Sequence, residues 1–106
     1  ALQQVPDDAQ VQYRLALAHA SLENHEEALE LYVPILEQKP TDPIFYAHVA
    51  LTLISLEQYE AADRLVRLGL EIAVESDDAA AEAELKDVRN RLWKAQGRVV
   101  RPLSEG

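Results

Sequence analysis

The histidines are the side chains of this sequence best suited to metal binding or acid–base catalysis. His19, His25 and His48 include no pair four residues apart, the spacing that puts two ligands on one face of a helix. The segment that begins at His25 has Leu29 in the place of the second histidine of the zinc motif H-E-x-x-H. The histidine spacing therefore predicts no metal site.

The other residue types that carry catalysis are scarce or scattered. The absence of cysteine excludes disulfides, thiolate ligands and a cysteine nucleophile. No serine stands in the G-x-S-x-G context of a nucleophile elbow, and the three glycines are too far apart to form a phosphate-binding loop. The many carboxylates fall on the polar faces of helical patterns. We therefore predict no catalytic residues and no cofactor, and we do not expect an enzyme unless a catalytic part lies in a longer chain.

The net charge of −9 is concentrated in the first part of the chain. Residues 1–63 carry eleven acids and two bases, whereas residues 64–106 carry eight of each. Because a nucleic-acid binder needs a basic face for the phosphates, this acidic body argues against nucleic acid as a partner. The bases near the C-terminus include Lys86, Arg89, Arg91 and Lys94, which suit either the negative end of a helix or an acidic partner.

Length and the two ends of the sequence limit the remaining classes of protein. The 106 residues are enough for one small domain. No apolar run approaches the ~20 residues of a membrane span and no signal-peptide pattern opens the chain, which together predict a cytoplasmic location. Methionine is absent even from position 1, so we expect a processed or excised piece.

A repeat with a period of 34 residues organises the sequence. Residues 6–39 and 40–73, aligned without gaps, share twelve identities, among them Leu17 with Leu51 and Ala28 with Ala62. A fixed period of this length is typical of stacked repeats, in which one unit cannot bury its apolar face alone. The sequence therefore predicts two copies of one helical unit.

The first copy reads as two helices. Asp7 or Asp8 can cap the first, which should run to about residue 22. Its apolar residues at helical spacing form one stripe: Val11, Leu15, Ala18 and Leu22. The second helix should run from about residue 25 to 38, with a kink at Pro34, which removes one amide and crowds the preceding turn.

Three more helices follow. Asp42 before Pro43 is a strong start signal for the third, and the fourth begins near residue 58. The segment Ser76-Asp77-Asp78 can cap a fifth, which Gly97 closes. Its apolar face consists of Leu85, Val88 and Leu92, with Trp93 beside it and partly packed.

These residues resemble the tetratricopeptide repeat, a unit of two antiparallel helices with small residues where they pack closely and a closing proline. The matches in the first copy are Leu15, Ala16, Ala28, Tyr32, Ile35 and Pro40. Those in the second are Tyr46, Val49, Ala50, Leu53, Tyr59, Ala62 and Val66. The departures are Gln12 and His19, where aromatic residues are usual, and Val74, where the proline would fall. The resemblance covers about residues 6–74, and the layout is similar to that of small bacterial tetratricopeptide proteins.

The resemblance implies an all-α superhelix in a domain of residues 1–97. Repeat 1 would span about 7–40 and repeat 2 about 41–74. A last helix at about 76–96 would cap the stack, because the final helix pair otherwise leaves one apolar side in water. Residues 98–106 show no periodicity and are predicted to be a flexible tail.

The same resemblance implies a protein-binding scaffold, since such repeats hold a peptide or helix along the concave face formed by the first helix of each pair. The residues at those positions in the first copy are Gln10, Tyr13, Leu17, Ala20 and Ser21. Those in the second copy are Ile44, Ala47, Leu51, Ile54 and Ser55. Tyr13 and Leu17 replace the Lys and Asn of the subset that grips a C-terminal carboxylate. The groove is apolar and suits an aliphatic or amphipathic helix.

Two questions stay open, and the first is the role of the two repeat-equivalent leucines. Leu17 and Leu51 either line this groove or complete the core within each repeat. The second question is the partner. As an alternative to binding another protein, the chain binds a second copy of itself, through the groove or through the basic C-terminal end, and forms a homodimer.

Overall fold

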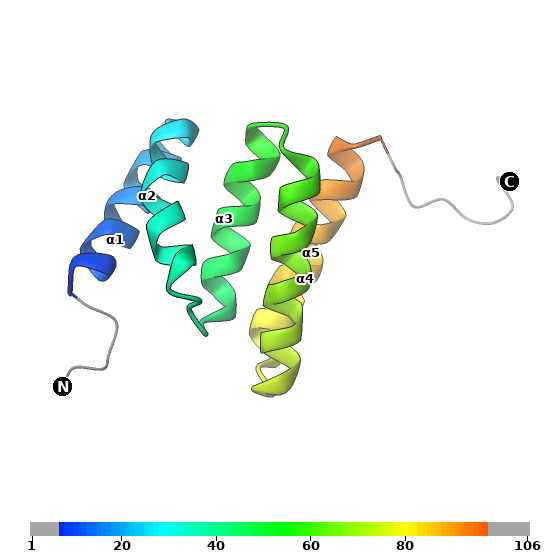
Figure 1. Cartoon of the computed structure of the whole chain (residues 1–106). Helices are drawn as coiled ribbons and strands as arrows, with labels where there is room; N and C mark the ends of the chain where they lie inside the picture. Colours follow the sequence, from blue (N-terminus) through cyan, green and yellow to red (C-terminus); the bar gives the residue numbers. More distant parts are fainter. Residues whose placement is uncertain (1–6, 98–106) are drawn as a thin grey trace, which may run out of the picture.

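The computed structural model describes residues 7–97, which form five helices (Figure 1). The helices are α1 (Asp7–Ser21), α2 (His25–Glu37), α3 (Pro43–Ser55), α4 (Tyr59–Glu75) and α5 (Ala79–Ala95). No strand occurs in this range, so the predicted all-α fold is confirmed. The predicted tail at 98–106 lies outside the described residues. Among the helices of residues 7–97, none has the length and apolar character that crossing a membrane requires.

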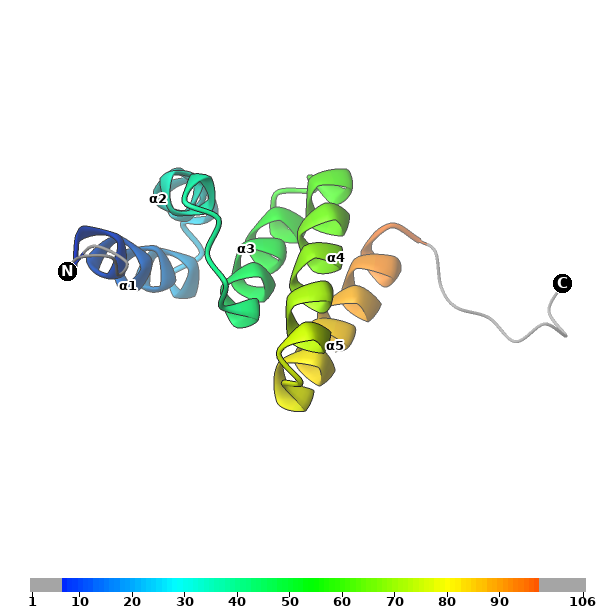
Figure 2. The ribbon, with the colours of Figure 1, turned by 60° about the horizontal axis from the view of Figure 1, so that its bottom comes forward.

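The helices follow one another across the molecule in chain order, alternating in direction (Figures 1 and 2). α1 packs against α2, and α3 packs against α4, so each repeat forms one helix pair. α3 also contacts α2, which joins the two pairs. α5 contacts both α3 and α4. It therefore covers the second pair on the side away from the first, which is the position of a capping helix.

Two of the predicted helix starts are made by aspartate side chains. The Asp42 carboxylate accepts a hydrogen bond from the Ile44 amide at 3.0 Å, and Pro43 is the first residue of α3. The Asp78 carboxylate accepts one from the Ala81 amide, also at 3.0 Å, at the start of α5. Both caps satisfy amides that a helix terminus leaves without a partner. The predicted cap at Asp7 or Asp8 concerns side chains outside those that the structure describes.

Two residues after the end of each of the five helices, the backbone adopts the left-handed conformation, and only the last of these residues is glycine. The φ angles are 66° at Glu23, 52° at Lys39, 63° at Glu57, 57° at Asp77 and 77° at Gly97. After three of them the next amide donates a hydrogen bond of 2.8 Å back into the helix, as from Gln58 to the Leu53 carbonyl. After Lys39 comes Pro40, which has no amide to donate. The chain thus leaves α1, α3 and α4 through the same local geometry.

Replacing Glu57 by glycine should therefore stabilise the protein. An L-residue in the left-handed region costs about 1–2 kcal/mol, and the extra freedom of glycine in the unfolded chain takes back about 0.5–1 kcal/mol. We expect Glu57→Gly to raise the free energy of unfolding by about 0.5–1 kcal/mol in urea denaturation. The matched control is Glu71→Gly inside α4, which should lower it by about 1 kcal/mol. Destabilisation by both variants would contradict the prediction.

Proline explains why the second helices of the two repeats differ in length. α2 has 13 residues and stops before Pro40, because a residue that precedes proline avoids the helical conformation. In the second repeat Val74 takes the corresponding place, and α4 continues to 17 residues. α2 itself stays continuous through Pro34.

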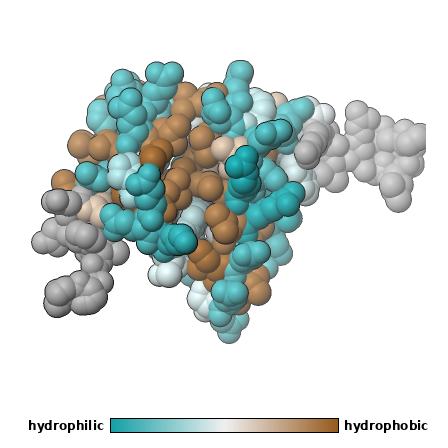
Figure 3. All heavy atoms as spheres, viewed as in Figure 1, coloured by the Kyte–Doolittle hydropathy of each residue, from teal (hydrophilic) through white to brown (hydrophobic). Residues whose placement is uncertain are grey.

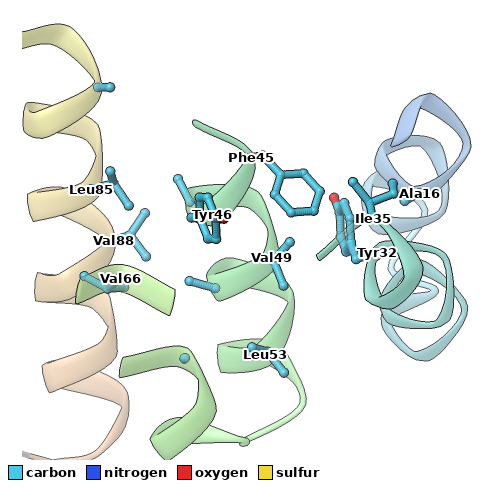
Figure 4. Close-up of a cluster of buried hydrophobic side chains, with 14 of the residues drawn as sticks. Ala16, Tyr32, Ile35, Phe45, Tyr46, Val49, Leu53, Val66, Leu85 and Val88 are labelled. Atoms are coloured by element: carbon cyan, nitrogen blue, oxygen red, sulfur yellow. The ribbon is translucent and has the colours of Figure 1, made fainter. Parts of the chain in front are cut away.

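The core lies on both sides of α3 (Figure 4). On one side the Phe45 ring packs against Tyr32 of α2, with ring centroids 5.6 Å apart and nearly perpendicular planes. On the other side Tyr46 faces Leu85 and Val88 of α5. The predicted capping face of α5 is buried in full: Leu85, Val88 and Leu92. α3 is thus the central helix of the fold.

Gly69 lets α4 approach α3 and α5 closely. A Cβ at this position would lie 2.9 Å from Leu85 Cδ2 and 3.0 Å from Tyr46 Cβ, closer than a side chain tolerates. The hydroxyl of Tyr46 donates a hydrogen bond of 2.7 Å to the Pro40 carbonyl. Tyr46 therefore connects the loop between the repeats to the contact between the last three helices.

The apolar stripe predicted on α1 does not face the core. Val11 is 60% exposed, Leu15 48% and Leu22 71%. The buried side of α1 lies opposite and carries the small residues Ala9 and Ala16. At the same repeat positions in α3, Phe45 and Val49 are buried because α1 and α2 precede them. No helix pair among residues 7–97 precedes α1, so its stripe faces solvent.

Candidate binding groove between the first three helices

A pocket of about 300 Å³ opens where α1, α2 and α3 meet. Its walls come from the C-terminal half of α1, the start and middle of α2, and the middle and end of α3. The lining residues are Leu17, Ala20, Ser21, His25, Tyr32, His48, Leu51, Thr52 and Ser55. The pocket therefore spans both repeats and exists only because α3 packs beside the first helix pair.

Half of the predicted groove residues line this pocket: Leu17, Ala20, Ser21, Leu51 and Ser55. Leu17 and Leu51 are half-buried, with part of each side chain open to the pocket. Of the others, Gln10 is exposed, and Ile44 and Ile54 are half-buried outside the pocket. Ala47 has no exposed surface and belongs to the core, so its placement among partner contacts is corrected.

Tyr13 packs inside an aromatic cluster where the two repeats meet. Its ring centroid lies 5.2 Å from that of Phe45, 6.2 Å from Tyr32 and 6.0 Å from His48, all with edge-to-face geometry. Burial raises the pKa of Tyr13 well above its usual range, and the carboxylate of Asp42 adds to the rise. Most of this side chain therefore holds the repeats together, below the surface of the predicted groove.

Four lining residues were missed in the sequence: His25, Tyr32, His48 and Thr52. Two of them lie on α2, and the prediction took residues only from the first helix of each pair. Tyr32 matched the repeat pattern as a core residue, which its full burial bears out. That Tyr32 also lines the pocket depends on where α3 lies, and the sequence of α2 gives no sign of it.

Two titratable groups that line the pocket, His48 and Tyr32, are held in their uncharged forms. Burial lowers the pKa of His48, against the opposing effect of the Glu84 and Asp42 carboxylates, so the ring is neutral at pH 7. Burial raises the pKa of Tyr32 to about 12, and the nearby Thr52 hydroxyl opposes that rise without reaching hydrogen-bond geometry. At pH 7 these two groups therefore add no charge to the pocket.

The arrangement offers side-chain surface and hydrogen-bonding groups. Within residues 7–97 no three His, Asp or Glu side chains come together as ligands for a metal ion. The His48 ring lies beside the Tyr13 ring, a packing contact that activates no nucleophile. Leu17, Ala20 and Leu51 supply apolar walls, and hydroxyl and imidazole groups supply polar points between them. Such a surface recognises a ligand by shape and hydrogen bonds.

Three of the four bases of α5 are engaged within their own helix. Lys86 pairs with Glu82 at 3.3 Å, and Arg91 pairs with Asp87 at 3.6 Å. The Arg89 guanidinium stacks over the Trp93 ring, 4.9 Å from its centroid. Trp93 is half-buried, as its sequence position predicted. These local contacts favour a structural role for the basic residues.

A second apolar strip lies on the face that carries α2 and α4. In Figure 3 hydrophobic side chains gather between these two helices, with polar side chains on both sides. The strip lies where the first helix pair meets the second.

Comparison with known proteins gives one likeness, at the level of structure. No protein-family model matches the chain, and no curated protein does. The chain is similar to the solution NMR structure of a tetratricopeptide repeat domain protein from Salinibacter ruber, with a TM-score of 0.75 and 23% sequence identity. The match covers 93% of this chain and 100% of that one. At this identity the likeness concerns the fold alone.

Proposed function

We propose that this chain, whose fold is that of tetratricopeptide repeats, is a non-enzymatic module that binds a peptide or helix of another protein. The binding site is the groove made by α1 and α3, with the pocket between the first three helices at its centre. The observation that carries the proposal is the incomplete burial of Leu17 and Leu51 beside a pocket of about 300 Å³. Apolar side chains left open in a concave surface are typical of a ligand site.

The chemistry of the groove indicates what kind of partner it takes. Ile44, Ile54 and Leu51 place half-buried aliphatic surface along α3, and Leu17 and Ala20 place it along α1. An amphipathic helix that lays its apolar side in this groove would bury that surface. The net charge of −9 favours a partner with basic residues outside the contact, since opposite charges speed association and suppress wrong partners.

Replacing Leu51 by glutamate tests the proposal. A carboxylate placed among apolar side chains should abolish capture of the partner from a cell lysate. The matched control is Leu68→Glu, which puts the same charge on an exposed apolar residue of α4, away from the pocket. Both variants should keep the helical circular dichroism of the native chain. Equal capture by the native chain and Leu51→Glu would contradict the groove as the binding site.

Self-association is the alternative, and the exposed stripe of Val11, Leu15 and Leu22 on α1 favours it. A second copy that packed on this stripe would make the measured mass depend on protein concentration. Glutamate at Leu15 would remove that dependence, whereas glutamate at Leu51 would not. Sedimentation of the native chain and these two variants over a range of concentrations distinguishes the two surfaces.

A further inference from the structure

One side of α1 carries an exposed apolar stripe, which consists of Val11, Leu15, Ala18 and Leu22. Three of the six large apolar side chains that are exposed within residues 7–97 belong to this stripe. The other three are divided between α2 and α4. Apolar side chains scattered singly on a surface need no explanation, whereas several gathered on one face mark a contact surface.

The same face of α3 shows how such a stripe is used in this fold. The equivalent positions of the second repeat are Phe45, Val49, Thr52 and Leu56. The first three are buried and Leu56 is half-buried, because the first helix pair lies against this side of α3. α1 therefore presents to solvent a face on which another helix packs elsewhere in the molecule.

The charge around the stripe suits contact between two copies of an acidic protein. Residues 9–22 contain no Asp or Glu and one base, Arg14, although the chain has a net charge of −9. The central helix α3 also lacks carboxylates, whereas α2, α4 and α5 each carry at least three. Two copies that meet at α1 therefore avoid the like-charge repulsion that contact through α2, α4 or α5 would bring.

We infer that the stripe packs against the same stripe of a second copy, with the two α1 helices antiparallel about a two-fold axis. Its residues are spaced by four, three and four positions, an order that is the same in both directions. Antiparallel helices then place Val11 of one copy opposite Leu22 of the other, and Leu15 opposite Ala18. Because a large side chain meets a small one near the axis, the two helices can approach closely.

Head-to-tail stacking of copies would match the stripe with an unsuitable surface. The opposite end of the molecule is closed by α5, and none of the large apolar side chains exposed in residues 7–97 lies on that helix (Figure 1). The exposed polar side chains of α5 after residue 82 are Glu84, Lys86, Asp87, Asn90, Arg91 and Lys94. An apolar stripe laid on them would remove water from charged groups without giving them new partners. The two-fold pairing avoids this cost and closes at two copies.

Pairing through the stripe leaves the groove free. Leu15 belongs to the stripe and Leu17 lines the pocket, and residues two positions apart on a helix point about 160° apart around its axis. The inference therefore does not rest on the proposed function, and either can fail without the other. If both hold, the dimer presents two grooves at once.

Sedimentation equilibrium over about 1 μM to 1 mM protein gives the first test. Only one helix of each copy enters the contact, so we expect a weak dimer that is monomeric in the dilute solutions used for denaturation. The mass of the native chain should rise toward twice that of the monomer as the concentration increases. Leu15→Glu brings two carboxylates close to the axis and should stay monomeric. The matched control Leu68→Glu, on an exposed residue of α4, should behave like the native chain.

Three results of this experiment would overturn the inference. The first is a native chain that stays monomeric at the highest concentration, and the second is a Leu15→Glu variant that still associates. The third is loss of association in Leu51→Glu, which would place the contact in the groove. Circular dichroism should show native helicity in all variants, since Leu15 and Leu68 are exposed and Leu51 is half-buried.

Disulfide formation tests the direction of the two helices, and the native chain contains no cysteine. Val11→Cys mixed with Leu22→Cys should form a disulfide between different copies, because the antiparallel stripes place these positions opposite each other. We expect this reaction to be about tenfold faster than that of the control Leu68→Cys with itself, since the contact raises the effective concentration of the thiols. Val11→Cys alone should react no faster than the control, because its two thiols would lie about 16 Å apart along the helices. A mixture no faster than the control, or rapid reaction of Val11→Cys alone, would overturn the antiparallel pairing.

Discussion

A chain that ends after Asp78 loses most of its helical structure. The truncation removes α5, whose Leu85, Val88 and Leu92 side chains are buried against the second helix pair. At about 1.5–3 kcal/mol for each fully buried side chain, their loss costs about 5–9 kcal/mol, before the newly exposed surfaces of α3 and α4 are counted. Because a domain of this size has a total stability of about 5–15 kcal/mol, the remaining repeats should be largely unfolded.

Circular dichroism and a thermal melt of the truncated chain check this expectation. The matched control ends after Gly97, which keeps α5 and its left-handed C-terminal glycine whole. We expect the control to melt like the full chain. A chain ending after Asp78 that kept its helicity and its melting temperature would show that α5 is not needed as a cap.

Phe45→Ala should be the most damaging single substitution in the junction between the repeats. Phe45 is 1% exposed, and its ring contacts three tyrosine rings, with centroids 5.2 Å away at Tyr13 and 5.6 Å away at Tyr32 and Tyr46. Truncating it leaves a cavity between α1, α2 and α3 and should cost about 3–5 kcal/mol. Since α2 reaches the second repeat mainly through α3, the first helix pair should lose order before the second.

The repeat provides a matched control for this substitution. Val11 occupies the position of Phe45 in the first repeat, yet it lies on the solvent side of α1, so Val11→Ala should change the stability by less than about 0.5 kcal/mol. Urea denaturation of both variants gives the two values. Equal losses would mean that the outer side of α1 is covered in solution, as the self-association alternative requires.

The helices and their local signals were predictable because each depends on residues close in sequence. Asp42 before Pro43 predicted the start of α3, and the segment ending in Asp78 predicted that of α5. The 34-residue period predicted two similar helix pairs, and Ala28 and Ala62 are both fully buried, as small residues at close helix contacts should be. The missing proline at Val74 was noticed in the sequence, and the structure adds its consequence, the longer α4.

The groove was predictable only in part. Periodicity places Leu17, Leu51 and their neighbours on one face of α1 and α3, and five residues of that face line the pocket. It could not separate Leu51, which stays open to the pocket, from Ala47, which is buried in the core. The two residues lie one turn apart on the same face of α3, and burial depends on which other helix covers each of them.

The sequence alone determined which segments are helical, where they begin and that they pair in a repeat, because these depend on hydrogen bonds and side chains within a few residues. The tertiary structure decided which face of each helix is covered. The apolar stripe of α1 faces solvent, whereas its counterpart on α3 is core, although their repeat positions are identical. It also placed the fully buried Tyr32 beside the pocket between the first three helices. The physical reason is that the burial of a residue depends on which other residues surround it in space. Residues distant in sequence are brought together only by the packing of whole helices.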